Sequence, residues 1–146
     1  MENTIANLNV FLANLNVFYR KLQNYHWNII GKDFFVIHAK LEEYYDKINE
    51  QIDEIAEHIL MIKGQPLGTM KDYLENASIQ EAKNEKVKDN EVFESIIKDY
   101  GALLQSVTDI KKQADEQSDY PTSSLMDDYI SEYTKILWML NQMKQS

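Results

Sequence analysis

A stripe of histidine and carboxylate side chains in the first half of the sequence is the part best suited to chemistry. His38 and Glu42 are four residues apart, and so are Asp53 and Glu57. Residues four apart lie on one side of a helix, so each pair can hold a cation. Imidazole and carboxylate ligands suit iron, and they also accept manganese or zinc. The stripe predicts metal binding, and the alternative is an ordinary solvated helix edge.

The two pairs of the stripe are too far apart to share one ion within a chain. On a continuous helix, His38 and Glu57 lie roughly 28 Å apart. Positions 38 and 57, like positions 42 and 53, are nevertheless centred on the same point between residues 47 and 48. If two copies of the helix cross antiparallel about a two-fold axis there, His38 and Glu42 of one chain face Glu57 and Asp53 of the other. Such an interface predicts two identical sites per dimer.

Hydrophobic periodicity predicts the helices that position this stripe. We expect long helices over about Thr4–Ile30, from a cap at Asp33 to about Lys63-Gly64, over Glu91–Ala114 and over Ser123–Met143, with a turn at Asp119, Tyr120 and Pro121 and a short helix at Met70–Asn76. The core positions expected on the first helix are Leu8, Phe11, Leu15, Phe18, Leu22 and Tyr25. With only 4 Gly and 2 Pro, these segments predict an all-α four-helix bundle, a single domain over residues 1–146.

Composition narrows the function further. The absence of cysteine excludes disulfides, thiolate zinc sites and a cysteine nucleophile. The net charge of −9 makes the average surface repel phosphate. No apolar run approaches the roughly 18 residues that suggest a membrane span, and no basic-then-apolar leader opens the chain. A cytoplasmic protein is therefore expected.

One long segment resembles the signature of the Dps family, the mini-ferritins of starved bacterial cells. It is Asn24–Ile59, with the sequence NYHWNIIGKDFFVIHAKLEEYYDKINEQIDEIAEHI. The pattern is H-W, a glycine five residues after the histidine, F-x-x-x-H, an acidic residue four later, and D-E-x-A-E. The likeness continues through G-x-P-x-G-T at residues 64–69 and through Trp138 in the last helix.

This resemblance implies a ferritin-like bundle that assembles into hollow shells of twelve subunits. Ferroxidase centres at two-fold interfaces would oxidise Fe(II), commonly with hydrogen peroxide and otherwise with O2, and the ferric product would be stored as mineral inside. The ligands implied are His26, His38 and Glu42 from one subunit, with Asp53 and Glu57 from its neighbour. From the residues alone, His26 is equally well explained as a hydrogen-bonded core histidine.

The resemblance also assigns residues around the centre. Trp27 matches a tryptophan that takes up stray oxidising equivalents, and packing at a subunit interface is its alternative role. Many members have Asp at the position of Glu42 and Arg at the position of His58, and a structural role is expected for His58. Asp46 and Asn49 are also symmetric about the proposed axis and are expected to form hydrogen bonds there.

Iron entry and DNA binding are less well supported by the residues. Family shells have acidic pores at three-fold axes, for which Asp119 and Asp115 are the best matches, with Asp127 and Asp128 nearby. A capped helix start is the alternative for this cluster. DNA-compacting members carry basic tails, because phosphate neutralisation supplies most non-specific affinity. Residues 1–19 contain no Lys or Arg, so direct DNA binding is not expected.

Three other classes of protein were weighed. A monomeric di-iron oxygenase would carry E-x-x-H on two helices, and this chain contains no such motif. A nucleoid protein that coats DNA would need the missing basic tail. A cage with a degenerate metal site is disfavoured by the full set of five ligand types.

Overall fold

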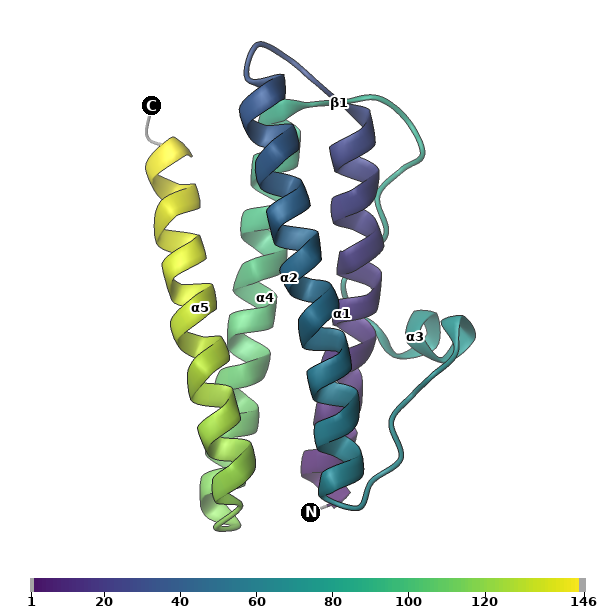
Figure 1. The fold of residues 1–146 in the computed structure, drawn as a ribbon, viewed down its shortest axis with the longest axis vertical. Helices are drawn as coiled ribbons and strands as arrows, with labels where there is room; N and C mark the ends of the chain where they lie inside the picture. Colours follow the sequence, from purple (N-terminus) through teal and green to yellow (C-terminus); the bar gives the residue numbers. More distant parts are fainter. Residues whose placement is uncertain (1, 145–146) are drawn as a thin grey trace.

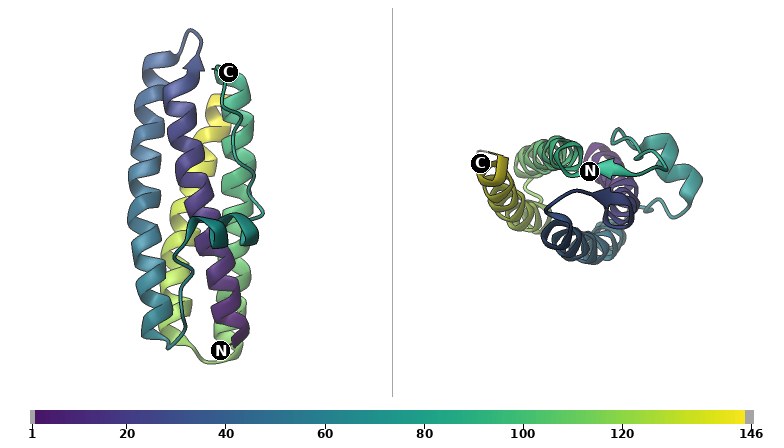
Figure 2. Two further views of the ribbon diagram at one scale, coloured as in Figure 1. Left: turned by 90° about the vertical axis from the view of Figure 1, so that its right-hand side faces the viewer. Right: turned by 90° about the horizontal axis from the view of Figure 1, so that it is seen from above.

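Four long helices lie side by side in an elongated bundle (Figure 1). The computed structural model describes residues 2–144. The long helices are α1 (Glu2–Asn28), α2 (Phe34–Met61), α4 (Asp89–Glu116) and α5 (Tyr120–Lys144). Helices α1 and α2 run antiparallel, as do α4 and α5, and one long connection climbs the outside of the bundle from α2 to α4 (Figure 2). The predicted all-α four-helix bundle is confirmed.

The connection between α2 and α4 carries the short helix α3 (Met70–Asn76), as predicted. Thr69 caps it, because the backbone N–H of Asp72 donates to the Thr69 hydroxyl oxygen at 3.2 Å. The connection ends in β2 (Val87–Lys88), which pairs in parallel with β1 (Ile29–Ile30). This ladder was not predicted, since two residues show no alternation of polar and apolar side chains.

The turn between α1 and α2 differs from its prediction in two details. Helix α1 ends at Asn28 because the next two residues pair in β1. Gly31 then adopts a φ of 140°, and a Cβ atom there would lie 2.5 Å from Oδ2 of Asp89. Glycine is therefore required on both counts. Asp33 does precede α2, but its side chain makes no capping hydrogen bond, so its expected role as a side-chain cap was wrong.

Helix α2 ends at Met61, close to the expected Lys63-Gly64 pair, although the two residues have unexpected roles. Lys63 takes the left-handed conformation, with a φ of 71°. The N–H groups of Lys63 and Gly64 donate to the carbonyls of Leu60 and Ile59, which closes the helix as a Schellman motif. Gly64 is needed for space, because its Cβ would lie 2.8 Å from Cγ2 of Ile5.

The last two helices are joined by a tight turn. Ser118 has a φ of 56°, and the N–H of Asp119 donates to the carbonyl of Ala114 at 2.9 Å. Helix α5 begins at Tyr120, earlier than the predicted Ser123, and takes Pro121 into its first turn. Proline is tolerated there because the first N–H groups of a helix have no intrahelical acceptor.

The predicted core of α1 is confirmed, since all six expected side chains are buried. Most apolar side chains on the inner faces of the other long helices are buried as well, and Phe34, Ile52, Leu104, Leu125 and Leu137 are only partly covered. Met126 is fully buried and was not predicted. No helix within residues 2–144 is both long enough and apolar enough to cross a bilayer.

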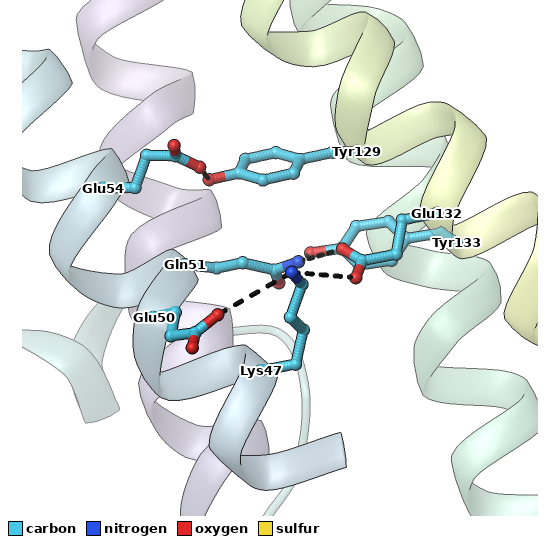
Figure 3. A network of polar contacts seen from close by, with 7 residues as sticks. All are labelled: Lys47, Glu50, Gln51, Glu54, Tyr129, Glu132 and Tyr133. Carbon is cyan, nitrogen blue, oxygen red and sulfur yellow. Dashed lines mark hydrogen bonds and ion pairs between the residues drawn. The ribbon is translucent and has the colours of Figure 1, made fainter. Parts of the chain in front are cut away.

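Long polar side chains connect α2 with α5 through hydrogen bonds. Helix α1 packs mainly on α2, and α4 packs mainly on α5. One hollow between α2 and α5 is lined by polar side chains, which we call the polar hollow: Lys47, Glu50, Gln51, Glu54, Asp128, Tyr129 and Glu132. Figure 3 shows that residues of both helices meet across it.

Candidate metal centre

Two histidines face each other where α1 ends and α2 begins. The rings of His26 and His38 stack in parallel, with centroids 3.7 Å apart and planes 7° from each other. Nδ1 of His26 lies 2.6 Å from the carbonyl oxygen of His38, and Nδ1 of His38 lies 2.7 Å from the carbonyl oxygen of His26. Because a carbonyl oxygen can only accept, both Nδ1 atoms carry the proton. In the neutral rings both Nε2 atoms then have a free lone pair, as metal ligation requires.

A carboxylate and a phenol border this histidine pair. Oε1 of Glu42 lies 3.6 Å from Nε2 of His26, and the Glu42 side chain is 56% exposed. The ring of Tyr45 stands edge-on to His26, at 5.4 Å between centroids. Burial, together with the charges of Glu42 and Asp46, raises the pKa of Tyr45, which therefore remains a protonated phenol. His26, His38 and Glu42 are thus brought together on one side of the bundle.

The second acidic pair lies further along α2. Asp53 and Glu57 are both exposed and sit one helical turn apart. A hydrogen bond with Asp53, together with the negative charge of Asp53, raises the pKa of Glu57. Two carboxylates that share a proton in this way are held close enough to repel each other when both are ionised. A cation between them would relieve that repulsion.

One chain does not gather all five predicted ligands. Within residues 2–144, no three histidine or acidic side chains come together in a way that could hold a metal ion. The histidine pair instead lies where α1 ends and α2 begins, and the Asp53–Glu57 pair lies in the second half of α2. The chain therefore carries two separate, incomplete sets of ligands.

The comparisons with known proteins agree with this fold. A model of the ferritin-like domain matches residues 5–145. The structure matches that of a Dps protein from Vibrio cholerae, described as a member of a broad superfamily of ferritin-like diiron-carboxylate proteins. The TM-score is 0.93 at 39% identity, over 97% of this chain and 89% of that one. A Dps protein from Bacillus brevis also matches, with a TM-score of 0.93 at 35% identity over 97% of this chain and 95% of that one.

The chain belongs to the Dps family of ferritin-like proteins. Among curated sequences, it is 41% identical to DNA protection during starvation protein 2 of Bacillus anthracis over 85 residues. This match spans 58% of each of the two chains. The chain thus matches a little over half of the length of this curated relative.

Within this Dps chain, Trp27 lies beside the histidine pair in sequence and faces outward. Its side chain is 55% exposed. The guanidinium carbon of Arg20 lies 5.9 Å from the centroid of the indole ring, within the range of a cation–π contact. An exposed indole held in this way is compatible with both expectations for Trp27, packing at an interface and a redox role.

The acidic residues expected at an iron-entry pore have structural partners in this chain. Asp119 is buried, and its carboxylate accepts hydrogen bonds from the hydroxyl and the N–H of Thr122. Asp115 is exposed, and Lys111 lies 3.8 Å from it and 3.0 Å from Asp127. These contacts favour the helix-capping alternative for Asp119 and leave Asp115 as the exposed candidate.

His58 has the structural role that was expected. It is buried, and its Nε2 lies 2.7 Å from the hydroxyl oxygen of Thr122. Because that hydroxyl donates its hydrogen to Asp119, the Nε2–H of His58 donates to Thr122. The end of α2 is thereby joined to the start of α5.

Two residues beside the candidate centre were missed from the sequence. The ring of Phe34 stacks on His38 at 4.8 Å. Tyr45 contacts His26 and hydrogen-bonds with Glu42. The signal for Tyr45 was available, since it lies three residues after Glu42 on the same side of a helix. Phe34 looked like an ordinary core residue.

Proposed function

We propose that this protein oxidises Fe(II) and stores the ferric product as mineral inside a hollow shell of twelve subunits. Two Fe(II) ions give one electron each to hydrogen peroxide, which takes up two protons and leaves as two waters; O2 is the other candidate oxidant. The observation that carries the proposal is the pair of incomplete ligand sets, one at the junction of α1 and α2 and one further along α2. Glu42, Asp53 and Glu57 are exposed and His26 is buried, and together the two sets supply all five proposed ligands.

The completed centre lies between two subunits. Asp53 and Glu57 of one chain would approach His26, His38 and Glu42 of its neighbour when two α2 helices cross antiparallel. The symmetry of positions 38 with 57 and 42 with 53 supports this crossing. Asp46 and Asn49, both exposed, would then meet near the two-fold axis. Oligomerisation is thus part of catalysis in this proposal.

The donor set fits iron as a substrate. Two imidazole nitrogens with their Nδ1 protons held by backbone carbonyls offer neutral ligands of fixed orientation. Three carboxylates supply hard oxygen ligands and negative charge that favours Fe(III) over Fe(II). Zinc and manganese accept the same ligands and are expected to compete for the site. A related Dps from Listeria innocua has been soaked with zinc, which makes zinc a convenient probe here.

The test is removal of the second ligand pair. The double variant Asp53→Ala, Glu57→Ala should lose rapid Fe(II) oxidation, followed by the absorbance of the ferric product after addition of peroxide or O2. The particle mass should remain that of the wild-type shell. Glu43→Ala is the matched control, because Glu43 is an exposed carboxylate of α2 that pairs with Lys40 and lies outside the proposed set. Unchanged kinetics in the double variant would reject the centre.

Protection of DNA is the second candidate function, since the curated relatives are named for it. We attribute such protection here to removal of iron and peroxide, the two reactants that generate hydroxyl radicals. The net charge is −9, and no Lys or Arg precedes Arg20, so phosphate contacts are few. Plasmid DNA should keep its mobility when mixed with the shells at about 0.15 M salt. Retarded DNA under these conditions would show direct binding instead.

A further inference from the structure

A continuous row of tyrosine rings runs through the core of the bundle. Tyr44 on α2 contacts Tyr100 on α4 at 5.5 Å between ring centroids. Tyr100 contacts Tyr133 on α5 at 5.7 Å, and Tyr133 contacts Tyr129 at 6.0 Å. All four side chains are buried, with Tyr100 and Tyr133 at 1% and 0% exposure. Rings at these separations are in van der Waals contact, so an electron can pass along the row without crossing solvent.

The row begins at Tyr44 on α2 and ends at Tyr129 on α5, whose hydroxyl group contacts α2 again. Tyr44 lies two residues from Glu42, in the half that holds the histidine pair. At the other end, the Tyr129 hydroxyl donates a hydrogen bond to Glu54, which is the neighbour of Asp53 (Figure 3). Tyr44 and Glu54 are ten residues apart, roughly 15 Å along the helix. The row therefore crosses the core from the half of α2 that holds Glu42 to the half that holds Asp53.

The last two tyrosines differ in their hydrogen-bond acceptors. The Tyr133 hydroxyl donates at 2.7 Å to the side-chain oxygen of Gln51, whose amide in turn donates to Glu132 (Figure 3). An amide oxygen is not a base that can take the proton. Tyr129 donates to the carboxylate of Glu54, which can. A tyrosine that loses an electron must also release its phenol proton to become a stable neutral radical. Of Tyr129 and Tyr133, only Tyr129 has an acceptor for that proton and can therefore hold the oxidising equivalent.

Burial raises the pKa of every tyrosine in the row, Tyr129 included, and the hydrogen bond with Glu54 raises the pKa of Tyr129 further. Burial raises the pKa of Tyr100 and Tyr133 well above the ordinary value, and it raises the pKa of Tyr44 to about 12. Proton loss without a nearby base is therefore disfavoured along the row. Tyr129 lies at the polar hollow, where Lys47, Glu50 and Glu132 also gather. At this end a reductant can approach from solvent.

We infer that Tyr44, Tyr100, Tyr133 and Tyr129 form a path for one-electron oxidation that ends at Tyr129, whose proton passes to Glu54. The source of the oxidant rests on the proposed function, since a centre that holds a single Fe(II) gives peroxide one electron and generates hydroxide and a hydroxyl radical. That radical takes an electron from the row and, with a proton from solvent, becomes water. The row recovers the electron from Tyr129, which becomes a neutral radical as Glu54 takes its proton. Another Fe(II) ion then reduces Tyr129, Glu54 returns the proton, and the iron becomes Fe(III).

The experiment first introduces the oxidising equivalent without iron. Iron-free assembled shells are mixed with a ruthenium polypyridyl complex, oxidised by flash and quench, and frozen for electron paramagnetic resonance. Wild-type protein should give a tyrosyl radical. Tyr129→Phe, which keeps the ring, should lose the accumulated radical, and Glu54→Gln should lose it although Tyr129 is present. Tyr73→Phe is the control that should leave the signal unchanged, since Tyr73 lies in α3 and outside the row.

Either of two results would overturn the inference. One is an unchanged radical in Tyr129→Phe or Glu54→Gln, and the other is the absence of any tyrosyl radical in the wild type. The same variants are then given Fe(II) and peroxide. If the flash experiment succeeds and iron is not oxidised, the proposed function fails and the electron path stands. If iron is oxidised normally and the flash experiment fails, the path is wrong and the proposed function stands.

Discussion

The imidazoles of His26 and His38 depend on each other. Each ring donates to the backbone carbonyl of the other residue, and the two rings stack. Loss of one ring removes the stacking partner of the other ring. It also removes a hydrogen bond between α1 and α2, which helps to keep the carbonyl acceptor of the remaining histidine in place. The orientation of either Nε2 atom is thus a property of the pair.

A double-mutant cycle tests this dependence. His26→Ala and His38→Ala should each weaken Zn²⁺ binding to assembled shells, measured by calorimetry. The double variant should lose less than the sum of the two losses, with a coupling of about 1 kcal/mol, because the first substitution already disorders the second ring. Strictly additive losses would show that the two histidines act independently.

His58 gives the stability of the protein a dependence on pH. Burial lowers the pKa of His58, while the charges of Asp119 and Glu54 oppose this shift. As the pH falls below the ordinary value of 6.5, the unfolded chain takes up a proton that the native protein resists. The free energy of unfolding should therefore fall with pH below 6.5, by at most about 1.4 kcal/mol per pH unit from this residue.

The variant His58→Gln isolates this effect. Its amide N–H can still donate to Thr122, and it does not titrate. Urea unfolding at a fixed protein concentration should show a weaker loss of stability between pH 7 and pH 5 in the variant than in the wild type. Equal slopes in the two proteins would assign the pH dependence to other groups.

At the scale of elements, α1 and α4 are joined by a buried ion pair. Nζ of Lys21 lies 2.8 Å from Oδ2 of Asp99, and both side chains are less than a tenth exposed. Burial raises the pKa of Asp99, although Lys21 opposes the shift. Each charge is tolerated in the interior because the other is present.

Removing one partner should cost more than removing both. Lys21→Met leaves Asp99 buried without its partner and should lower the free energy of unfolding by about 3–5 kcal/mol. Lys21→Met combined with Asp99→Leu should recover most of that loss, because no buried charge remains. The measurement is the denaturant midpoint of the wild type, the single variant and the double variant. A double variant no more stable than the single one would contradict this reading.

The helices could be predicted from sequence because each repeats an apolar pattern over many turns. Leu8, Phe11 and Leu15 illustrate this on α1, and all three are fully buried. The β1–β2 ladder could not be predicted, since it joins positions 29 and 87 through backbone groups that every residue has. The start of α5 at Tyr120 was missed because proline was treated as the end of the turn, while it also fits the first turn of a helix.

The candidate centre was predictable in its residues and only partly in its contacts. The spacing of His38, Glu42, Asp53 and Glu57 follows from a helix, so their separation into two sets was foreseen. The reciprocal bonds between His26 and His38 depend on how two helices meet, which periodicity does not give. For the same reason the contacts from Tyr44 to Tyr129 across three helices were not foreseen.

At the scale of the whole molecule, a centre shared between chains predicts complementation. Shells of His38→Ala subunits and shells of Glu57→Ala subunits should both oxidise Fe(II) slowly. Reassembled from an equal mixture, they should regain about a quarter of the wild-type rate, because half of the random pairings are mixed and each mixed dimer has one intact site of its two. A mixture no faster than its parents would reject the shared centre.

The two-residue ladder between β1 and β2 also affects the order in which the molecule folds. It closes a loop of nearly sixty residues, at an entropic cost of roughly 3–4 kcal/mol, which a few backbone hydrogen bonds cannot offset alone. The ladder must therefore form late, after α1 has docked on α4. The α1–α2 hairpin depends on contacts between near neighbours in sequence and can form first. We expect the stacked histidines to be in place early on the folding pathway, and the ladder to close the bundle above them as one of its last steps.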